Sequence, residues 1–212
     1  VILLSKGNIM TKLIYVESSP RKERSHSVRV ARAFLDEYSN KNPLDTIEVI
    51  DLWSKALPPF NEDRLNAKYS IMHGQAPTPA EEEAWKEIES LFDEFNQADK
   101  YVFSVPMWNF GFPYTLKHYI DLITQPGLAW SHSPEEGFKG LVQGKVLAIY
   151  AAGGSYEAGS ETEAFDLQKP SFESWLGFIG LTEVERLVVE PTLAPPEDLQ
   201  SLENKLIDAA KQ

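Results

Sequence analysis

Side chains that can bind an anion gather near the start of the chain, between residues 18 and 27 (the serine segment). The donors in this segment are Ser19, Arg21, Lys22, Arg24, Ser25 and Ser27. The segment joins a predicted strand to a predicted helix, and the first N–H groups of a helix also favour an anion. A phosphate monoester would fit these donors. The alternative is that Ser25 or Ser27 simply caps the helix, as serine often does.

A second segment, Pro106 to Pro113 (the aromatic segment), carries large apolar side chains in a predicted loop. Its sequence is Pro-Met-Trp-Asn-Phe-Gly-Phe-Pro, and the two prolines with Gly111 between them indicate a fixed backbone. Such aromatic side chains either stack on a flat ligand, or pack under neighbouring segments or against another subunit. The residues alone leave these interpretations open.

A third segment, residues 151–156 (the glycine segment), follows a predicted strand and contains Gly153 and Gly154. Glycines at the carboxyl end of a strand allow backbone N–H groups to approach the edge of a ligand. An ordinary turn would favour glycines equally. The segment therefore indicates either backbone donors for a ligand or a structural turn.

Alternating strands and helices predict how these segments are positioned. Short apolar runs predict strands at residues 12–17, 45–51, 101–105, 145–151 and 183–189. Apolar residues at three-to-four spacing predict helices at residues 28–38, 81–98, 114–123, 165–179 and 196–212. Residues 61–79 are expected to be partly helical, and residues 128–139 to form a turn or short hairpin. The predicted fold is α/β: a three-layer, doubly wound, five-stranded parallel sheet with the flavodoxin-like order 2-1-3-4-5.

In that strand order the three segments adjoin the switch point between the first and third strands, so they form one site. A phosphate cradle at one end, with aromatic and backbone-donor walls at the other, matches a mononucleotide that carries a flat ring. FMN fits this description better than a dinucleotide does. The serine segment has neither Walker A spacing nor G-x-G-x-x-G, which argues against an ordinary NTP site and a Rossmann dinucleotide site.

The composition narrows the class of protein further. The 212 residues carry a formal charge of -12, which disfavours binding to nucleic acid or to an anionic membrane surface. No apolar run is long enough to span a membrane, and the absence of cysteine fits a reducing compartment, so a cytoplasmic protein is expected. We expect a single domain over residues 10–212, with residues 1–9 as an upstream extension or expression remnant. His118 and Asp121 have no third metal ligand near them in the sequence, so no metal site is predicted.

Four stretches of the chain resemble the FMN-dependent NADH azoreductases, also called NADH:quinone oxidoreductases, within the flavodoxin-like fold. The first is Ser19 with Ser25-His26-Ser27, and the second is Pro106-Met107-Trp108-Asn109-Phe110. The others are Pro113 with Leu116-Lys117-His118-Tyr119-Ile120-Asp121, and Leu176-Gly177-Phe178-Ile179-Gly180-Leu181. The resemblance runs from about Met10 to the C-terminal helix.

The resemblance implies a homodimer with FMN near the interface, and it assigns the cofactor-binding residues. The phosphate-binding serines correspond to Ser19, Ser25 and Ser27, with His26 where relatives often have glutamine. The ring-contacting segment corresponds to Pro106, Met107, Trp108, Asn109 and Phe110. The last flavin loop corresponds to Ala151, Ala152, Gly153 and Gly154. Two departures are Trp108, where many relatives have tyrosine, and Ala151-Ala152, where many have polar residues. Tryptophan at position 108 should preserve stacking but alter the shape of the pocket. The loss of polar side chains at Ala151-Ala152 bears on flavin potential and substrate preference more than on flavin binding.

The implied activity is a ping-pong, two-electron reduction of a quinone or azo compound by NADH or NADPH. FMN carries the hydride chemistry, so no side chain is expected to be a catalytic acid or base. Candidates for the apolar substrate pocket are Trp53, Phe60 and, across a dimer, Trp130. An alternative is an electron carrier similar to flavodoxin that does not oxidise NAD(P)H itself. A further alternative is a flavin-free interaction module that retains only the fold.

Overall fold

The computed structural model describes residues 10–210, so the predicted extension at residues 1–9 lies outside the described residues. The strands of the main sheet are β1 (Lys12–Glu17), β2 (Thr46–Asp51), β3 (Lys100–Pro106), β6 (Lys145–Ala151) and β7 (Glu183–Val189). The helices are α1 (His26–Lys41), α2 (Glu62–Met72), α3 (Pro79–Asn96), α4 (Tyr114–Ile123), α5 (Gln168–Ile179) and α6 (Pro196–Ala210). The remaining elements are the hairpin strands β4 (Trp130–Ser133) and β5 (Gly137–Gly140), and short 3-10 turns at Lys22–Arg24 and Glu163–Phe165.

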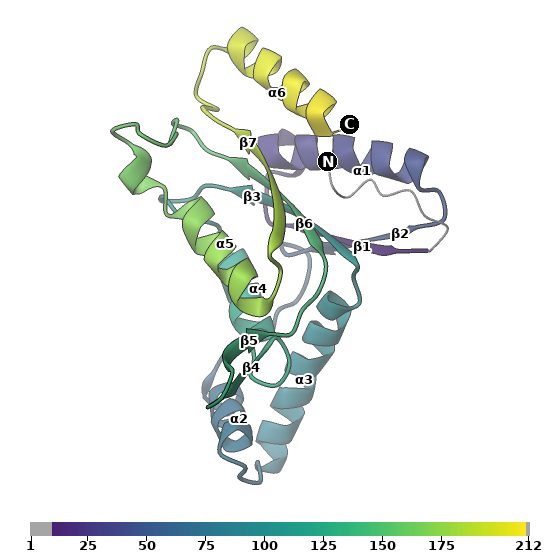
Figure 1. The fold of residues 1–212 in the computed structure, drawn as a ribbon, viewed down its shortest axis with the longest axis vertical. Helices are drawn as coiled ribbons and strands as arrows, with labels where there is room; N and C mark the ends of the chain where they lie inside the picture. Colours follow the sequence, from purple (N-terminus) through teal and green to yellow (C-terminus); the bar gives the residue numbers. More distant parts are fainter. Residues whose placement is uncertain (1–9, 211–212) are drawn as a thin grey trace.

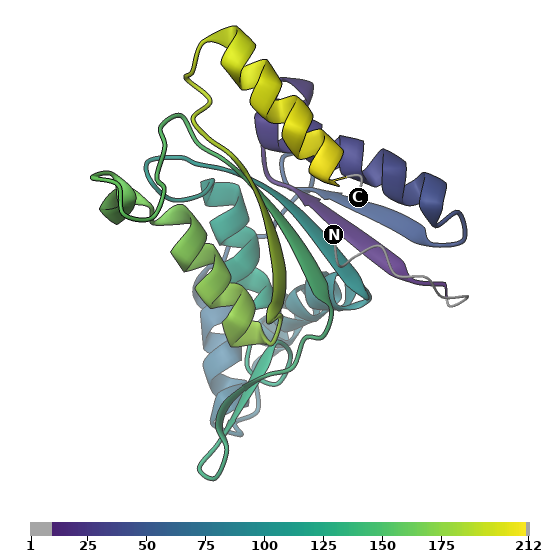
Figure 2. The ribbon, with the colours of Figure 1, turned by 45° about the horizontal axis from the view of Figure 1, so that its top comes forward.

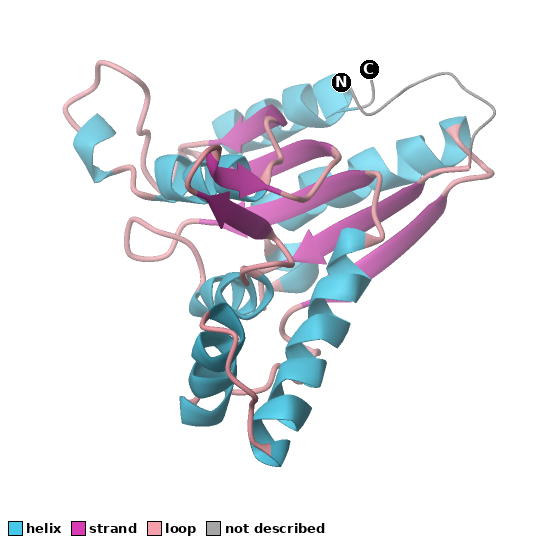
Figure 3. Ribbon diagram, turned by 60° about the horizontal axis from the view of Figure 1, so that its bottom comes forward, coloured by secondary structure: helices cyan, strands magenta, loops and turns pink. Residues whose placement is uncertain are grey.

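Within the described residues the main sheet is parallel throughout and has the order β2-β1-β3-β6-β7. Figure 3 shows its strands side by side, with helices on either side of them. Numbered along the chain, this is the predicted order 2-1-3-4-5. The predicted hairpin is also present, because β4 and β5 pair in antiparallel fashion. The α/β fold with a doubly wound parallel sheet is therefore confirmed.

Helices cover both faces of the sheet (Figures 1 and 2). α1 and α6 lie on one face, where Leu13 and Tyr15 of β1 enter a core cluster with the apolar side chains of α1. α3, α4 and α5 lie on the other face, where Ile14 and Val16 belong to a second cluster. Burial on both faces explains why β1 is a continuous apolar run rather than an alternating one. Successive side chains of β1 therefore point in turn into the two core clusters.

Three predicted helices begin at positions different from those expected: α1 begins at His26 rather than residue 28, and the other two shifts have a local cause. The helix predicted at residues 81–98 begins at Pro79, because Thr78 and Glu81 form a capping box around a proline that suits the first turn. The helix predicted at residues 165–179 begins at Gln168, which leaves Pro170 in its first turn, where proline is tolerated. In residues 10–210, no helix combines the length and the apolar character needed to cross a membrane.

A buried polar cluster fastens the amino ends of the strands, at the edge opposite the candidate site. Asp45 Oδ1 accepts the N–H of Thr11 at 3.0 Å, and Oδ2 accepts the hydroxyl of Tyr38 at 2.5 Å. The hydroxyl of Tyr38 also accepts from Nζ of Lys100 at 2.8 Å. Burial acts to raise the pKa of Asp45, but the hydrogen bonds from Thr11 and Tyr38 outweigh it and hold this pKa below its usual value.

This cluster predicts a stability effect that depends on pH. Because the folded pKa of Asp45 is depressed, its contribution is present above the unfolded pKa and is lost as pH falls through the folded pKa. We expect Asp45→Asn to lower the free energy of unfolding by about 1–3 kcal/mol at pH 7. The difference from the wild type should shrink below about pH 4. Urea unfolding at several pH values measures this, and a difference that does not change with pH would contradict it.

Candidate functional site

The parallel register brings the three predicted segments to one edge of the sheet. Glu17, the last residue of β1, pairs with Ser104 of β3, and Pro106 of β3 pairs with Ala151 of β6. The hydroxyl of Ser18 donates to the carbonyl of Ser104 at 2.5 Å. The N–H of Met107 donates to the carbonyl of Ala151 at 2.7 Å. The aromatic and glycine segments are therefore joined directly, and the serine segment is joined to β3 two residues before the aromatic segment begins.

The serine segment presents buried hydroxyls at the start of α1. Ser19, Ser25 and Ser27 are at most 3% exposed, and the hydroxyls of Ser25 and Ser27 lie 3.3 Å apart. Ser25 occupies the N-cap position of α1, yet in the described part of the chain its side chain makes no capping hydrogen bond. Thr78 and Asn61 do cap α3 and α2 with their side chains. Capping by Ser25, the alternative considered from the sequence, is therefore not what the structure shows.

The basic residues of the serine segment do not form the anion-binding cluster that their spacing indicates. Lys22 has a left-handed backbone with φ of 49°, and its ammonium pairs with the buried carboxylate of Glu17 at 2.9 Å. It also pairs with Asp51 at the end of β2. Arg21 and Arg24 are exposed. Carboxylates at the ends of β1 and β2 thus engage the lysine, a contact that the sequence order does not reveal.

His26, the first residue of α1, contacts the C-terminal helix. Its Nδ1 lies 2.5 Å from Oε1 of Glu203 in α6, and the same carboxylate oxygen accepts from Arg29 at 2.5 Å. The side-chain nitrogen of His26 that remains for a ligand is therefore Nε2. The backbone N–H of His26 lies in the first turn of α1. Glu203 was not among the residues predicted from the sequence, although a glutamate beside Leu202 on an apolar helix stripe is a signal that the sequence contains.

The aromatic segment forms a tight turn with an uncommon backbone. Trp108 and Gly111 exchange both N–H to carbonyl hydrogen bonds at 3.0 Å. Between them, Asn109 and Phe110 have φ of 48° and 69°, the arrangement of a type I′ turn. Asparagine suits the first of these positions, whereas glycine is usual at the second. The fixed backbone expected from Gly111 and the prolines is therefore produced by Asn109 and Phe110.

This turn places Trp108 in an exposed group of aromatic rings. The ring centroids of Trp53 and Trp108 lie 5.7 Å apart, and those of Trp53 and Tyr114 lie 5.5 Å apart. Trp108 is 37% exposed and Tyr114 is 66% exposed. Nε1 of Trp53 donates to the carbonyl of Ser18 at 2.8 Å, which ties this group to the serine segment. Of the predicted pocket residues, the structure brings Trp53 to the aromatic segment.

The other two predicted pocket residues lie elsewhere in the described chain. Phe60 is partly buried against the core cluster beneath α3 and α4. Trp130 of the β4–β5 hairpin stacks with Phe138 and Phe178 at 5.5 and 5.6 Å between ring centroids. Within residues 10–210 no ring contact joins either of them to Trp108. A place for Trp130 over the site of a second subunit remains a prediction.

The glycine segment offers backbone donors at the same edge. Ala151 and Ala152 are 6% and 3% exposed, and the N–H of Ala152 donates to Val189 at the end of β7. The carbonyl of Gly153 accepts the N–H of Leu193 at 3.2 Å. Among the described residues, no hydrogen bond uses the N–H of Gly153 or Gly154. These two partly exposed amides can therefore donate to a ligand.

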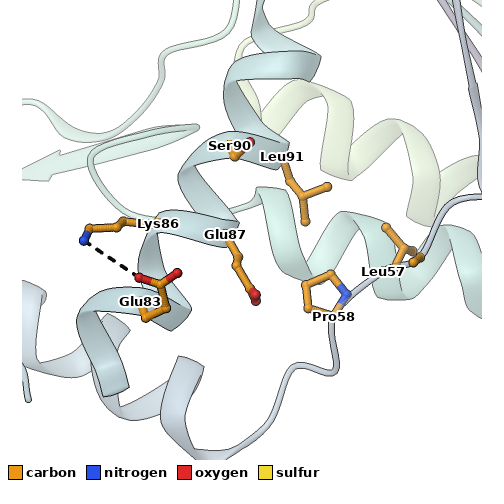
Figure 4. Close-up of a pocket in the computed structure, with 8 residues that line it drawn as sticks. Leu57, Pro58, Glu83, Lys86, Glu87, Ser90 and Leu91 are labelled. Carbon is orange, nitrogen blue, oxygen red and sulfur yellow. Dashed lines mark ion pairs between the residues drawn. The ribbon is translucent and has the colours of Figure 1, made fainter. Parts of the chain in front are cut away.

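His118 and Asp121, which the sequence places three residues apart, each have another partner in the structure. In the described part of the chain, no three His, Asp or Glu side chains gather in a way that would hold an ion. His118 Nε2 hydrogen-bonds the carbonyl of Pro58 at 2.8 Å, and Asp121 pairs with Lys117 at 2.5 Å. A hollow of about 490 Å³ lies beside Pro58, between the connection after β2 and α3 (Figure 4). Its lining includes no residue of the three segments.

The strand order and the loops at the switch point define a protein of the flavodoxin-like class. A family model of the flavodoxin-like fold matches residues 11–212. An FMN-dependent NADH:quinone oxidoreductase of Desulfotalea psychrophila is 47% identical over 184 residues, which are 87% of this chain and 87% of that protein. One from Nitratidesulfovibrio vulgaris (strain DP4) is 44% identical over 205 residues, which are 96% of this chain and 98% of that protein.

A solved structure of an azoreductase is also similar to this chain. An azoreductase from Bacillus anthracis superposes with a TM-score of 0.86 at 29% identity, covering 95% of this chain and 97% of that one. The chain therefore belongs to the family of FMN-dependent NADH:quinone oxidoreductases, and it is an oxidoreductase.

The type I′ turn predicts that the backbone of the aromatic segment is fixed by Asn109 rather than by Gly111. Asn109→Val should lower the free energy of unfolding by about 1–2 kcal/mol, because a β-branched residue resists positive φ. Gly111→Ala should change it by less than about 0.5 kcal/mol. Its φ is not in the left-handed region, and an added Cβ would approach the Trp108 carbonyl at 3.8 Å. Urea unfolding measures both values, and a larger effect of Gly111→Ala would show that the strained position is misassigned.

Proposed function

We propose that this protein binds FMN at the edge where the three segments meet and uses it to reduce quinones and azo compounds with NADH or NADPH. The observation that carries the proposal is the set of donors gathered there. Buried hydroxyls lie at an uncapped helix start, and the free amides of Gly153 and Gly154 lie across the same edge. The relatives are named FMN-dependent NADH:quinone oxidoreductases.

The serine segment suits the phosphate of FMN. Ser19, Ser25 and Ser27 would supply hydroxyl donors, and the first turn of α1 would supply backbone N–H groups. With its side chain held by Glu203, His26 would contribute its backbone N–H and Nε2. Several converging donors of this kind can hold a monoester without a P-loop lysine.

The aromatic and glycine segments suit the flavin ring. Pro106, Met107, Trp108, Asn109 and Phe110 would lie along it, with the strained turn fixing the indole of Trp108. Ala151 and Ala152 would support the backbone, and the amides of Gly153 and Gly154 would donate to the polar edge of the ring. When bound, FMN supplies the hydride transfer, so the chain itself needs no catalytic acid or base.

The exposed rings suit flat substrates. Trp53, Trp108 and Tyr114 form an apolar surface on which a nicotinamide, and then a quinone or azo compound, can stack in turn. An electron carrier needs instead a surface that docks a protein partner. The names of the relatives favour the reductase over the carrier.

A homodimer is also part of the proposal. Phe138 and Phe178 are 66% and 38% exposed and pack against Trp130 with tilted rings, which gives an apolar surface that a second copy can cover. Such a surface would bring Trp130 near the site of the second copy. The charge of -12 speaks against nucleic acid as a partner, and the lack of cysteine accords with the cytoplasm.

The serine hydroxyls give the first test of the proposal. Ser25→Ala combined with Ser27→Ala should raise the Kd for FMN at least about 100-fold, because two hydrogen bonds to a charged group are lost. Fluorescence titration with FMN measures this. Ser39→Ala, which changes an exposed serine on the same helix, is the matched control and should bind FMN as the wild type does. Equal affinities for the double variant and the control would mean that the phosphate is held elsewhere.

Steady-state turnover separates the reductase from the carrier. The purified protein with FMN should oxidise NADH or NADPH continuously when menadione is supplied, with the parallel double-reciprocal lines of a ping-pong reaction. A protein that binds FMN but does not oxidise either nicotinamide would be the electron carrier. A protein whose visible spectrum does not change on incubation with FMN would be the flavin-free module.

A further inference from the structure

One charged residue of α6 lies where an apolar side chain is expected. Glu203 is 3% exposed and belongs to the stripe on which Leu199, Leu202 and Leu206 pack against α1 and the sheet. A carboxylate is almost never buried without partners, since its desolvation is costly. Its presence on the apolar face therefore calls for a specific role.

The partners of Glu203 all belong to the start of α1. Oε1 of Glu203 lies 2.5 Å from Nδ1 of His26 and 2.5 Å from a guanidinium nitrogen of Arg29. Arg29 also donates to the carbonyl of Glu23, within the serine segment, at 3.3 Å. Figure 2 shows α6 lying alongside α1 on the same face of the sheet. A single carboxylate of the C-terminal helix thus fastens the first turn of α1 and the turn that precedes it.

The carboxylate is ionised at neutral pH. Burial acts to raise the pKa of Glu203, but the hydrogen bonds from Arg29 and His26 outweigh burial and hold the pKa below its usual value. The hydrogen bonds are therefore charge-assisted, which makes them stronger than neutral ones. They are strong enough to hold a side chain in one orientation.

We propose that Glu203 is a positioning residue for the phosphate of the cofactor, acting from α6 through His26. His26 stands between Ser25 and Ser27, whose hydroxyls are buried at the same helix start. Holding its imidazole on α6 fixes the backbone of this first turn, and with it the direction of the N–H groups and hydroxyls that bind the anion. The inference rests on the proposed function, since it requires FMN to bind at the serine segment.

This arrangement couples two parts of the chain that are far apart in sequence. The hydrogen bond that Glu203 accepts from His26 is proposed to favour the conformation of the first turn that binds phosphate. Bound phosphate must then favour the packing of α6 on α1 by the same free energy. The isoalloxazine ring lies outside this coupling, because its proposed contacts are in the aromatic and glycine segments. Riboflavin, which carries the ring without the phosphate, is therefore the discriminating ligand.

The test compares FMN with riboflavin in Glu203→Gln. The amide keeps the shape of the side chain but removes its charge, so we expect the Kd for FMN to rise about tenfold. The Kd for riboflavin should stay within about twofold of the wild type. In a His26→Gln background, Glu203→Gln should have no further effect on the Kd for FMN, because the partner it acts through is gone. Asp208→Asn, which removes an exposed charge from the same helix, is the matched control.

The outcomes distinguish a positioning role of Glu203 from a purely structural one. Equal losses for FMN and riboflavin would mean that Glu203 only stabilises the fold, and an undiminished effect in the His26→Gln background would mean that it does not act through His26. An unchanged Kd for FMN in Glu203→Gln would overturn the inference and leave the proposed function intact. If the wild type binds neither FMN nor riboflavin, the proposed function itself fails.

A second measurement uses the wild-type protein and does not depend on whether a variant folds. Hydrogen exchange of the α6 amides should slow when FMN is added and should not change when riboflavin is added at equal saturation. Slowing by both ligands to the same extent, or by neither while FMN binds, would show that α6 is not linked to the phosphate.

Discussion

The position of Ser18 is the constraint on which the candidate site depends. Its side chain is fully buried, its hydroxyl donates to the carbonyl of Ser104, and its own carbonyl accepts from Nε1 of Trp53. One residue therefore joins the end of β1, the end of β3 and the connection after β2. A buried polar group left without a partner costs about 1–3 kcal/mol, so each of these bonds resists displacement. The serine segment and the aromatic rings keep their relative positions for this reason.

The architecture could be predicted from the sequence because its signals are local. Strands β1, β3 and β6 are buried on both faces, so they appear as largely apolar runs, whereas β7 is an edge strand in which only Val189 is buried. Alternation with amphipathic helices then fixes a parallel sheet, and the strand order places the three loops at one edge. The start of α3 was placed two residues late, although Thr78 and Glu81 have the spacing of a capping box and Pro79 suits the first turn.

The details of the site could not be predicted, because they depend on partners that are distant in the sequence. Glu203 and His26 are 177 residues apart, and no local pattern links them. Lys22 meets Glu17 and Asp51 only once β1 and β2 lie side by side. The type I′ turn is a different case, because Phe110 opposes the usual preference for glycine there. Its backbone is held by the paired bonds of Trp108 with Gly111 and by the N–H of Leu167, which donates to the carbonyl of Phe110 at 3.1 Å.

The electrostatics of the edge would allow so acidic a chain to accommodate the proposed phosphate. With Lys22 engaged by Glu17 and Asp51, the donors of the serine segment that remain beside Ser25 and Ser27 are hydroxyls and backbone N–H groups. Such dipoles act over a few ångströms, whereas the charge of -12 acts over the Debye length of about 10 Å. A large polyanion meets the repulsive field over its whole length, but a small monoester that enters the edge gains every short-range bond at once. Neutral donors would therefore favour a small monoester over a polyanion. An open cluster of lysines would attract both.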